Sequence, residues 1–397
     1  MYAGATAEAE AAAAKSTYDD FAQRYPLFQD IHVMIFIGFG YLMTFLRKYG
    51  YTAVGFTFLI GAFVMQWHIL NEDFWHAVFS RKFDKYVELN LGDFMRADFS
   101  AGAVLITFGA LIGKTSPTQM LTVAIFEVIA YNINENIGLK LGIADVGGSY
   151  VIHMFGAYFG LACSWVLSPR SASGRSDNAA VYHSDLFAMI GTIYLWMYWP
   201  SFNAGPQSGI PAQRAVVNTL LSMSGSCGAA FLCSKNLRVD KKFNMVDIQN
   251  ATLAGGVAIG AVADMLVYPV GAILIGAAGG FISVVGYNKI TPFLEEKAKL
   301  HDTCGIHNLH GMPSLISGIS ACIVAALASP STYGVDLSSV YPKRGPDRSA
   351  QVQSQMQVAF LFITLGVAIT AGLITGWVAK HPFFDPMHDG HLFLDSA

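Results

Sequence analysis

The chain has 397 residues, of which 53% are hydrophobic and only 13% are charged, and its mean hydropathy is +0.44. It is far more apolar than a typical soluble domain, which indicates an integral membrane protein. A formal net charge of −3 and a pI near 6.4, without any block of basic residues, exclude a nucleic-acid-binding protein.

Residues 1–30 form a polar leader that lacks the charged-then-apolar order of a signal peptide. A membrane helix needs roughly 20 mainly apolar residues, and residues 31–380 divide by this measure into eleven candidate spans, followed by a short tail, 381–397. An odd number of spans places the two termini on opposite sides of the membrane. Lys and Arg are slightly more numerous on the side that is cytoplasmic when the N-terminus is outside, which favours that orientation. The expected spans are 31–46, 51–70, 97–113, 117–141, 148–168, 185–204, 212–234, 244–267, 268–288, 305–329 and 356–380.

Small residues and cysteines both indicate packing inside these spans. Many of the 39 glycines fall within spans, as in ATLAGGVAIGAVAD, and small residues let membrane helices approach closely. None of the five cysteines belongs to a CxxC pair, which favours packed thiols over disulfides or a zinc site.

One pattern, an aspartate eight residues before a histidine, occurs twice. Asp145 precedes His153 and Asp302 precedes His310, so both residues recur at one offset, since 302 − 145 = 157 and 310 − 153 = 157. The offset carries the fifth span onto the tenth, which predicts two five-helix units of inverted topology plus one extra C-terminal helix. Each aspartate is a candidate helix N-cap, and eight helical residues rise about 12 Å, which places each histidine near mid-bilayer.

Two readings of the histidines are open from the residues alone. Each could be a buried, hydrogen-bonded imidazole, but an ionisable side chain in a bilayer normally marks a functional pathway. His307 and Cys304 lie close by, yet no carboxylate completes a ligand set, so we expect no metal. A pore lined by two neutral imidazoles and apolar side chains favours a small neutral solute over an ion.

Long runs of the sequence resemble the Rhesus glycoproteins of the ammonium transporter superfamily. These runs are FQDIHVMIFIGFGYLMTFLRKYG, SDLFAMIGTIYLWMYWPSFN, DIQNATLAGGVAIG and DTCGIHNLHGMP, and the resemblance extends over about residues 26–380. It implies an all-α polytopic membrane protein, a homotrimer of eleven-helix protomers, each with its own ammonia pore, and an outside N-terminus.

The resemblance also implies roles for individual residues. His153 and His310 match the twin pore histidines, and Phe99 and Phe202 match the pair that closes the outer mouth. Asn203 matches the polar position beside that gate. The acidic residues near the two pore ends are Asp145 and Asp302.

Four features depart from the family pattern or qualify it. Animal members often carry an extra N-terminal membrane helix, where this chain has the polar leader. His307 stands where the family commonly has Asn, so a second titratable group lies near His310. The tail histidines His388 and His391 are expected in a solvated terminus, and the sequon at Asn250 falls inside a span, where glycosylation is not expected.

Together these observations predict a channel for ammonia, with methylamine as an analogue and carbon dioxide as a second candidate solute. We expect no enzymatic activity, no cofactor and no partner beyond the bilayer and the other protomers, and a location in the plasma membrane. An electrogenic ammonium transporter and a non-transporting sensory or structural protein are the alternatives. An ion-coupled transporter would need intramembrane acids, for which Asp264 and Glu127 are the candidates.

Overall fold

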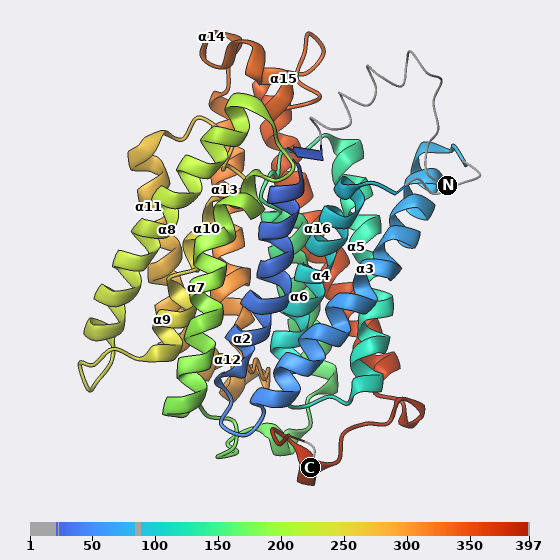
Figure 1. Ribbon diagram of the computed structural model, residues 1–397. Helices are drawn as coiled ribbons and strands as arrows, with labels where there is room; N and C mark the ends of the chain where they lie inside the picture. Colours follow the sequence, from blue (N-terminus) through green and yellow to red (C-terminus); the bar gives the residue numbers. More distant parts are fainter. Residues whose placement is uncertain (1–20, 23, 84–88, 396–397) are drawn as a thin grey trace.

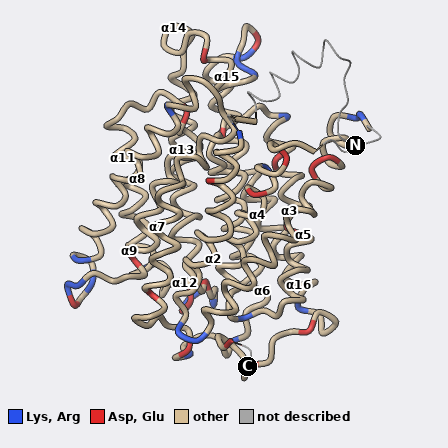
Figure 2. The backbone as a smooth tube through the Cα atoms, in the orientation of Figure 1, with Lys and Arg blue, Asp and Glu red and all other residues tan. Residues whose placement is uncertain are grey.

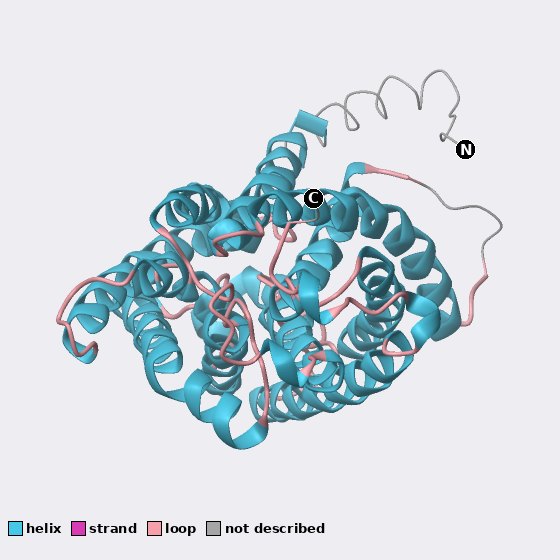
Figure 3. Ribbon diagram, turned by 90° about the horizontal axis from the view of Figure 1, so that it is seen from below, coloured by secondary structure: helices cyan, strands magenta, loops and turns pink. Residues whose placement is uncertain are grey.

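The computed structural model describes residues 21–22, 24–83 and 89–395, and Figure 1 shows them as a bundle of roughly parallel helices. The end of the bundle at which the C-terminal segment lies is called the lower end, and the opposite end is called the upper end (Figure 1). Viewed from the lower end, the helices fill an oval outline (Figure 3). Within the described ranges, extended pairing is limited to two isolated bridges, Leu46 with Ala180 and Gly345 with Arg348.

The main helical elements follow the expected order along the chain. The first span contains η1 (Met34–Phe39), α2 (Gly40–Leu42) and η2 (Met43–Phe45). The others are α3 (Gly50–Ser80), α4 (Leu91–Leu111), α5 (Pro117–Leu141), η3 (Ser149–Met154), α6 (Phe155–Leu167), η4 (Arg170–Ala172), α7 (Tyr182–Ala204), α8 (Gly209–Leu237), α9 (Met245–Ala251), α10 (Ala254–Gly260), α11 (Tyr268–Val285), η5 (Gly286–Ile290), α12 (Thr291–Ala298), η6 (His307–Gly311), α13 (Met312–Leu327), α14 (Pro330–Tyr333), η7 (Gly334–Asp336), α15 (Leu337–Val340), α16 (Ala350–Ala379), η8 (Pro382–Phe384) and η9 (Asp389–His391).

Eight helices in the described residues are long and apolar enough to cross a membrane. Several of these helices extend beyond their expected bounds: the first begins at Arg24, the second continues to Ser80, and the one from Tyr268 continues to Ala298. The extra turns are polar. A span predicted from hydropathy therefore stops before them, although the helical backbone continues. The other three expected spans correspond to α5, α7 and the broken pair α9–α10, and most of the 1–30 leader lies outside the described residues.

Local sequence explains where the central helices begin and end. Asn90 and Asp93 form a reciprocal capping box at the start of α4, and Ser116 and Gln119 form another at the start of α5. Helix α5 ends at Gly142, which has a left-handed φ of 63°. These signals fix the α4–α5 turn at the lower end, beneath the centre of the bundle.

Small residues bring the helices into close contact, as predicted. A Cβ on Gly276 of α11 would lie 1.8 Å from the carbonyl oxygen of Ser222 on α8, and one on Gly156 of α6 would lie 2.6 Å from that of Ala103 on α4. Such approaches are possible only at glycine. All five cysteines are free thiols.

The C-terminal segment corrects one sequence interpretation. His388 and His391 are exposed, as expected, but Leu392 and Phe393 are fully buried. The Phe393 N–H donates to the Gly113 carbonyl at 2.9 Å, and the Asp395 carboxylate accepts from the Thr52 N–H at 2.7 Å, near the start of α3. The tail is therefore docked on the lower end, because two apolar side chains anchor it beyond its polar stretch.

Charged residues gather mainly toward the two ends of the bundle, with few in the middle (Figure 2). This distribution is expected where apolar hydrocarbon surrounds the middle of the bundle and water bathes both ends. The few charged groups within the middle therefore stand out as candidates for a functional role.

Candidate functional site

The two repeated turns bring His153 and His310 together in the middle of the bundle. Their Nδ1 atoms lie 3.1 Å apart, and the rings stack with centroids 5.2 Å apart and planes 12° apart. Both side chains are buried. A hydrogen bond at this distance needs one Nδ1 to donate and the other to accept, so the accepting ring is a neutral imidazole.

The turns that carry the histidines are built alike. Gly148 and Gly305 again differ by 157 positions, and both have left-handed φ angles, 66° and 73°. Each glycine precedes a π-helical turn, η3 or η6, that contains the histidine. A side chain at either glycine would strain the backbone, because the left-handed φ angle favours glycine. The sharp bend before each π-helical turn therefore explains why a glycine follows each aspartate at the spacing D-x2-G.

The repeated aspartates accept from backbone N–H groups of these turns, but the predicted N-cap position is wrong, because the N-cap residues are Gly148 and Ile306. Asp145 Oδ2 accepts from the N–H groups of Tyr150 and Val151 at 2.9 and 3.0 Å. Asp302 accepts from three consecutive N–H groups, beginning at Gly305, each at 3.0 Å. The carboxylates thus satisfy donors that would otherwise be orphaned at a buried helix start, although each lies before the formal cap residue.

Aromatic rings cover the histidine pair on both sides. Phe99 and Phe202 meet edge-on with centroids 4.8 Å apart, and Phe202 lies 5.8 Å from His153. Phe39 stacks 6.3 Å from His310 on the other side. Trp199, which sequence reasoning did not single out, stacks 5.6 Å from His153; the run WPSFN contains it beside Phe202, but composition alone gave it no special role.

A cavity of about 290 Å³ lies on the upper side of the aromatic pair. Phe99 forms part of its wall, Asp145 and Glu135 supply carboxylates, and Arg24 and Arg96 supply guanidinium groups. Asp145 Oδ1 has no hydrogen-bond partner. Sequence reasoning missed Glu135; its signal was a charged residue within the predicted span 117–141.

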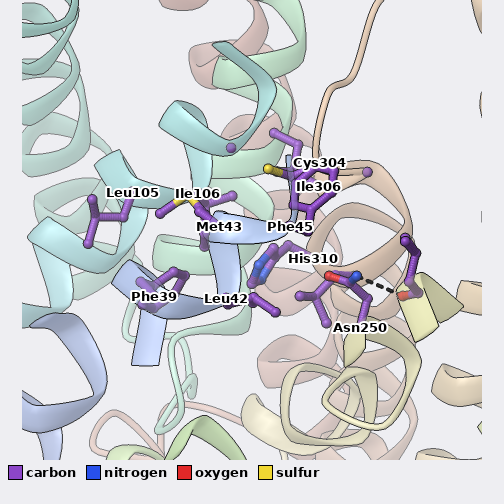
Figure 4. A pocket seen from close by; sticks show the side chains of 14 residues that line it. Phe39, Leu42, Met43, Phe45, Leu105, Ile106, Asn250, Cys304, Ile306 and His310 are labelled. Carbon is purple, nitrogen blue, oxygen red and sulfur yellow. Dashed lines mark hydrogen bonds between the residues drawn. The ribbon is translucent and has the colours of Figure 1, made fainter. Parts of the chain in front are cut away.

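A cavity of about 30 Å³ lies on the lower side, beside His310 (Figure 4). This volume holds roughly one water-sized molecule. No charged side chain lines it, and its polar atoms come from His310, Asn250, Cys304 and backbone. Its other side chains are apolar: Phe39, Leu42, Met43, Phe45, Leu105, Ile106, Val246, Ile306 and Leu309.

Two predicted site residues lie apart from these cavities. The ring of His307 meets the ring of Tyr158 edge-on at 5.8 Å, and His307 lines neither cavity. Asn203 is fully buried behind Phe202, where its amide donates to Thr219 Oγ1 at 3.0 Å. The spacing of three between His307 and His310 suggested one shared face, but the wider π-helical turn rotates His307 toward α6.

The two intramembrane acids of the ion-coupled alternative also lie away from the cavities. Glu127 is fully buried and accepts from Thr107 Oγ1 at 2.7 Å, whereas Asp264 accepts from Gln207 Nε2 at 2.9 Å near the upper end. Among the residues that the structure describes, no three His, Cys, Asp or Glu side chains gather as metal ligands.

A buried clamp holds the segment that leads into η6. The Lys114 ammonium donates to Ser164 Oγ at 3.0 Å, to the His301 carbonyl at 2.8 Å and to His301 Nδ1 at 3.0 Å. Burial lowers the pKa of Lys114 to about 7, and burial together with Lys114 lowers the pKa of His301 to about 3. His301 is therefore neutral near pH 7 and can accept from Lys114.

Comparisons with known proteins agree with this architecture. The model of the Ammonium Transporter Family matches residues 3–381. Ammonium transporter Rh type B of Danio rerio is 47% identical over 384 residues, covering 96% of this chain and 83% of that protein. Rh type C of Canis lupus familiaris is 44% identical over 384 residues, covering 95% and 83%.

Solved structures show the same relationship. Rh50 of Nitrosomonas europaea, described as belonging to the Rhesus protein family of channels, superposes with a TM-score of 0.81 at 34% identity, covering 95% of this chain and 93% of that one. A sensor Amt protein at 19% identity, with a TM-score of 0.71, shares the fold. The chain belongs to the ammonium transporter family, in its Rhesus branch.

Proposed function

We propose that the protein is a channel that conducts ammonia as neutral NH3 through each protomer. The observation that carries this proposal is the buried, hydrogen-bonded pair His153–His310, enclosed between the Phe99–Phe202 pair and a cavity of about 30 Å³ whose wall has no charged side chain. The relatives named above, ammonium transporters of the Rh type, agree with it.

The size and lining of the lower cavity favour a neutral solute. An ammonium ion there would lose its hydration to an apolar wall, at a cost of many kcal/mol, because no carboxylate faces it. NH3 loses a few hydrogen bonds only, and an imidazole nitrogen can replace one of them. The same wall therefore passes the base and rejects the ion.

The upper cavity is polar where the lower one is apolar, and in this proposal it gathers ammonium. Its wall carries the carboxylates of Asp145 and Glu135 beside the guanidinium groups of Arg24 and Arg96, and among the described residues Asp145 Oδ1 has no hydrogen-bond partner. We propose that ammonium releases its proton to water at the Phe99–Phe202 pair, and that NH3 then passes the two imidazoles. It regains a proton from water at the lower end.

The finer architecture belongs to the same proposal. Counting α5, α7 and the α9–α10 pair as crossings in addition to the eight apolar helices gives eleven. The equal spacing of the aspartates, positive-φ glycines and histidines supports the five-plus-five inverted repeat. We place the upper end outside the cell and the lower end in the cytoplasm of a plasma-membrane homotrimer.

The test uses purified protein in liposomes, with internal pH followed by stopped flow and net current recorded together after an ammonium gradient is imposed. Fast alkalinisation without current is the expected result. Current that scales with ammonium would instead establish the electrogenic mechanism, and a response equal to that of empty liposomes would favour a sensory or structural role. Carbon dioxide, the second candidate solute, is tested by acidification of the same liposomes.

A further inference from the structure

A second large cavity opens at the lower end, apart from the pore. It measures about 1330 Å³ and lies among the ends of α5, α6, α12 and α16. The four basic side chains in its wall are Lys114, Arg170, Lys299 and Lys380. Nothing in the proposed conduction of ammonia uses this space.

Three of the basic groups of this cavity donate to backbone carbonyls, and the charge of Lys114 also interacts with Asp302 and Glu295. Lys380 Nζ donates to the Val166 carbonyl at 3.0 Å, and Lys299 Nζ donates to the Glu296 carbonyl at 2.8 Å. Within the described part of the chain, none of the four basic side chains forms an ion pair with a carboxylate.

The two acids in the wall are Glu295 and Glu296. Glu295 accepts at 2.6 Å from Oγ of Ser173, which lines the same cavity, and Glu296 pairs with Lys297 at 2.5 Å. Four basic side chains against two acidic ones leave the wall with an excess of positive charge. A cavity of this kind fits a multiply hydrogen-bonding anion, such as a phosphate group.

An apolar groove of about 360 Å³ adjoins this cavity through Lys380, which lines both. Its other wall residues are Trp377, Val378, His381 and Phe384. Trp377 is 74% exposed, and Trp165, in the wall of the larger cavity, is 58% exposed. Exposed indoles at the end of a membrane bundle mark the level of the lipid head groups.

We propose that the cavity and groove together form a binding site for an anionic phospholipid of the cytoplasmic leaflet. Arg170 and Lys380 hold the phosphate, and an acyl chain lies along Trp377 and Phe384. The leaflet follows from the orientation given with the proposed function, but binding itself is independent of conduction. A free phosphate shares the head-group chemistry and leaves the apolar groove unused.

The experiment compares protein variants in nanodiscs made from equal parts of phosphatidylcholine and phosphatidylserine, with retained phosphatidylserine counted by native mass spectrometry after transfer to detergent. Because one basic residue near the membrane surface contributes roughly fivefold in affinity, Arg170→Ala with Lys380→Ala should lower retention at least tenfold. Lys235→Ala with Lys242→Ala, one cation in the last turn of α8 and one in the connection to α9, is the matched control and should retain the lipid as the wild type does.

Two further measurements distinguish a phospholipid head group from a free phosphate ion as the ligand. Trp377→Ala should weaken phosphatidylserine retention severalfold, whereas inorganic phosphate should not displace the lipid. Displacement by phosphate with no effect of Trp377→Ala would overturn the lipid assignment in favour of a free anion. Equal retention by the Arg170/Lys380 variant and the control would overturn the site itself. Ammonium-driven alkalinisation of liposomes is measured with the same variants and is expected to be unchanged. This measurement shows whether a failure of the proposed conduction is separate from a failure of lipid binding.

Discussion

The two Asp–Gly–His turns share one sequence pattern but lie in different surroundings. At the upper turn, the Asp145 carboxylate faces a cavity of about 290 Å³ and keeps one oxygen without a partner. At the lower turn, Asp302 binds three N–H groups, and its neighbour His301 is clamped by Lys114. The pattern thus fixes how each histidine is presented, whereas neighbouring elements decide whether the aspartate also meets solute.

This difference gives the two aspartates different roles in the proposed channel. The upper aspartate can attract a cation because an oxygen remains available to it. The lower aspartate is committed to the backbone and stabilises the turn that carries His310. Each of the following predictions breaks or sharpens this contrast.

The largest expected effect is on stability at the lower turn. Asp302→Ala should lower the free energy of unfolding by about 3 kcal/mol, because three backbone N–H groups lose a charged acceptor, and Asp145→Ala by about 2 kcal/mol, because two do. Thermal unfolding in detergent measures both, with the exposed Asp347→Ala as the control. Equal losses, or a larger loss at Asp145, would contradict the assignment of the lower turn as the structural one.

Removing either histidine tests whether the two turns act as one site. His153→Ala and His310→Ala should each change the ammonia flux, or admit ammonium current, by about tenfold, since either change breaks the shared 3.1 Å contact. Combined pH and current recordings in liposomes measure this. The exposed His183→Ala should behave as the wild type; if the pore variants do as well, the pair has no role in conduction.

Removing the charge of Glu135 from the upper cavity should affect the recruitment of ammonium alone. Glu135→Gln should raise the half-saturating ammonium concentration about fivefold while leaving the maximal rate and the stability unchanged, because a nearby negative charge concentrates cations. Initial rates at several ammonium concentrations measure it, and raised ionic strength should narrow the gap from the wild type. Glu296→Gln at the lower end is the control, and an equal response from it would point to a general surface effect.

The smallest effect is expected at His307. Because its ring lies against Tyr158 and outside both cavities, His307→Asn should change the ammonia flux less than twofold between pH 6 and 8. Stopped-flow alkalinisation across this range tests it. A large pH-dependent change would place His307 on the pathway after all.

The sequence predicted the outline of the fold better than its edges. Hydropathy located the helices but began the first too late, at residue 31, and ended two others too early, at residues 70 and 288. Polar turns extend these helices past the apolar core. It also gave the tail a solvated character, since spacing cannot reveal that Leu392 and Phe393 find a site on the lower end. Glu135 and Trp199 escaped notice because their importance depends on what lies beside them in space.

The sequence by itself determined the membrane class, the repeated turns and the identity of the paired histidines, because composition, period and a fixed offset of 157 residues are written in the chain. Only the tertiary structure decided which residues share a cavity. His307 is three positions from His310 yet faces another helix, and His153 lies 157 positions away yet is within hydrogen-bonding distance. The physical reason is that packing among helices distant in sequence sets the direction of each side chain.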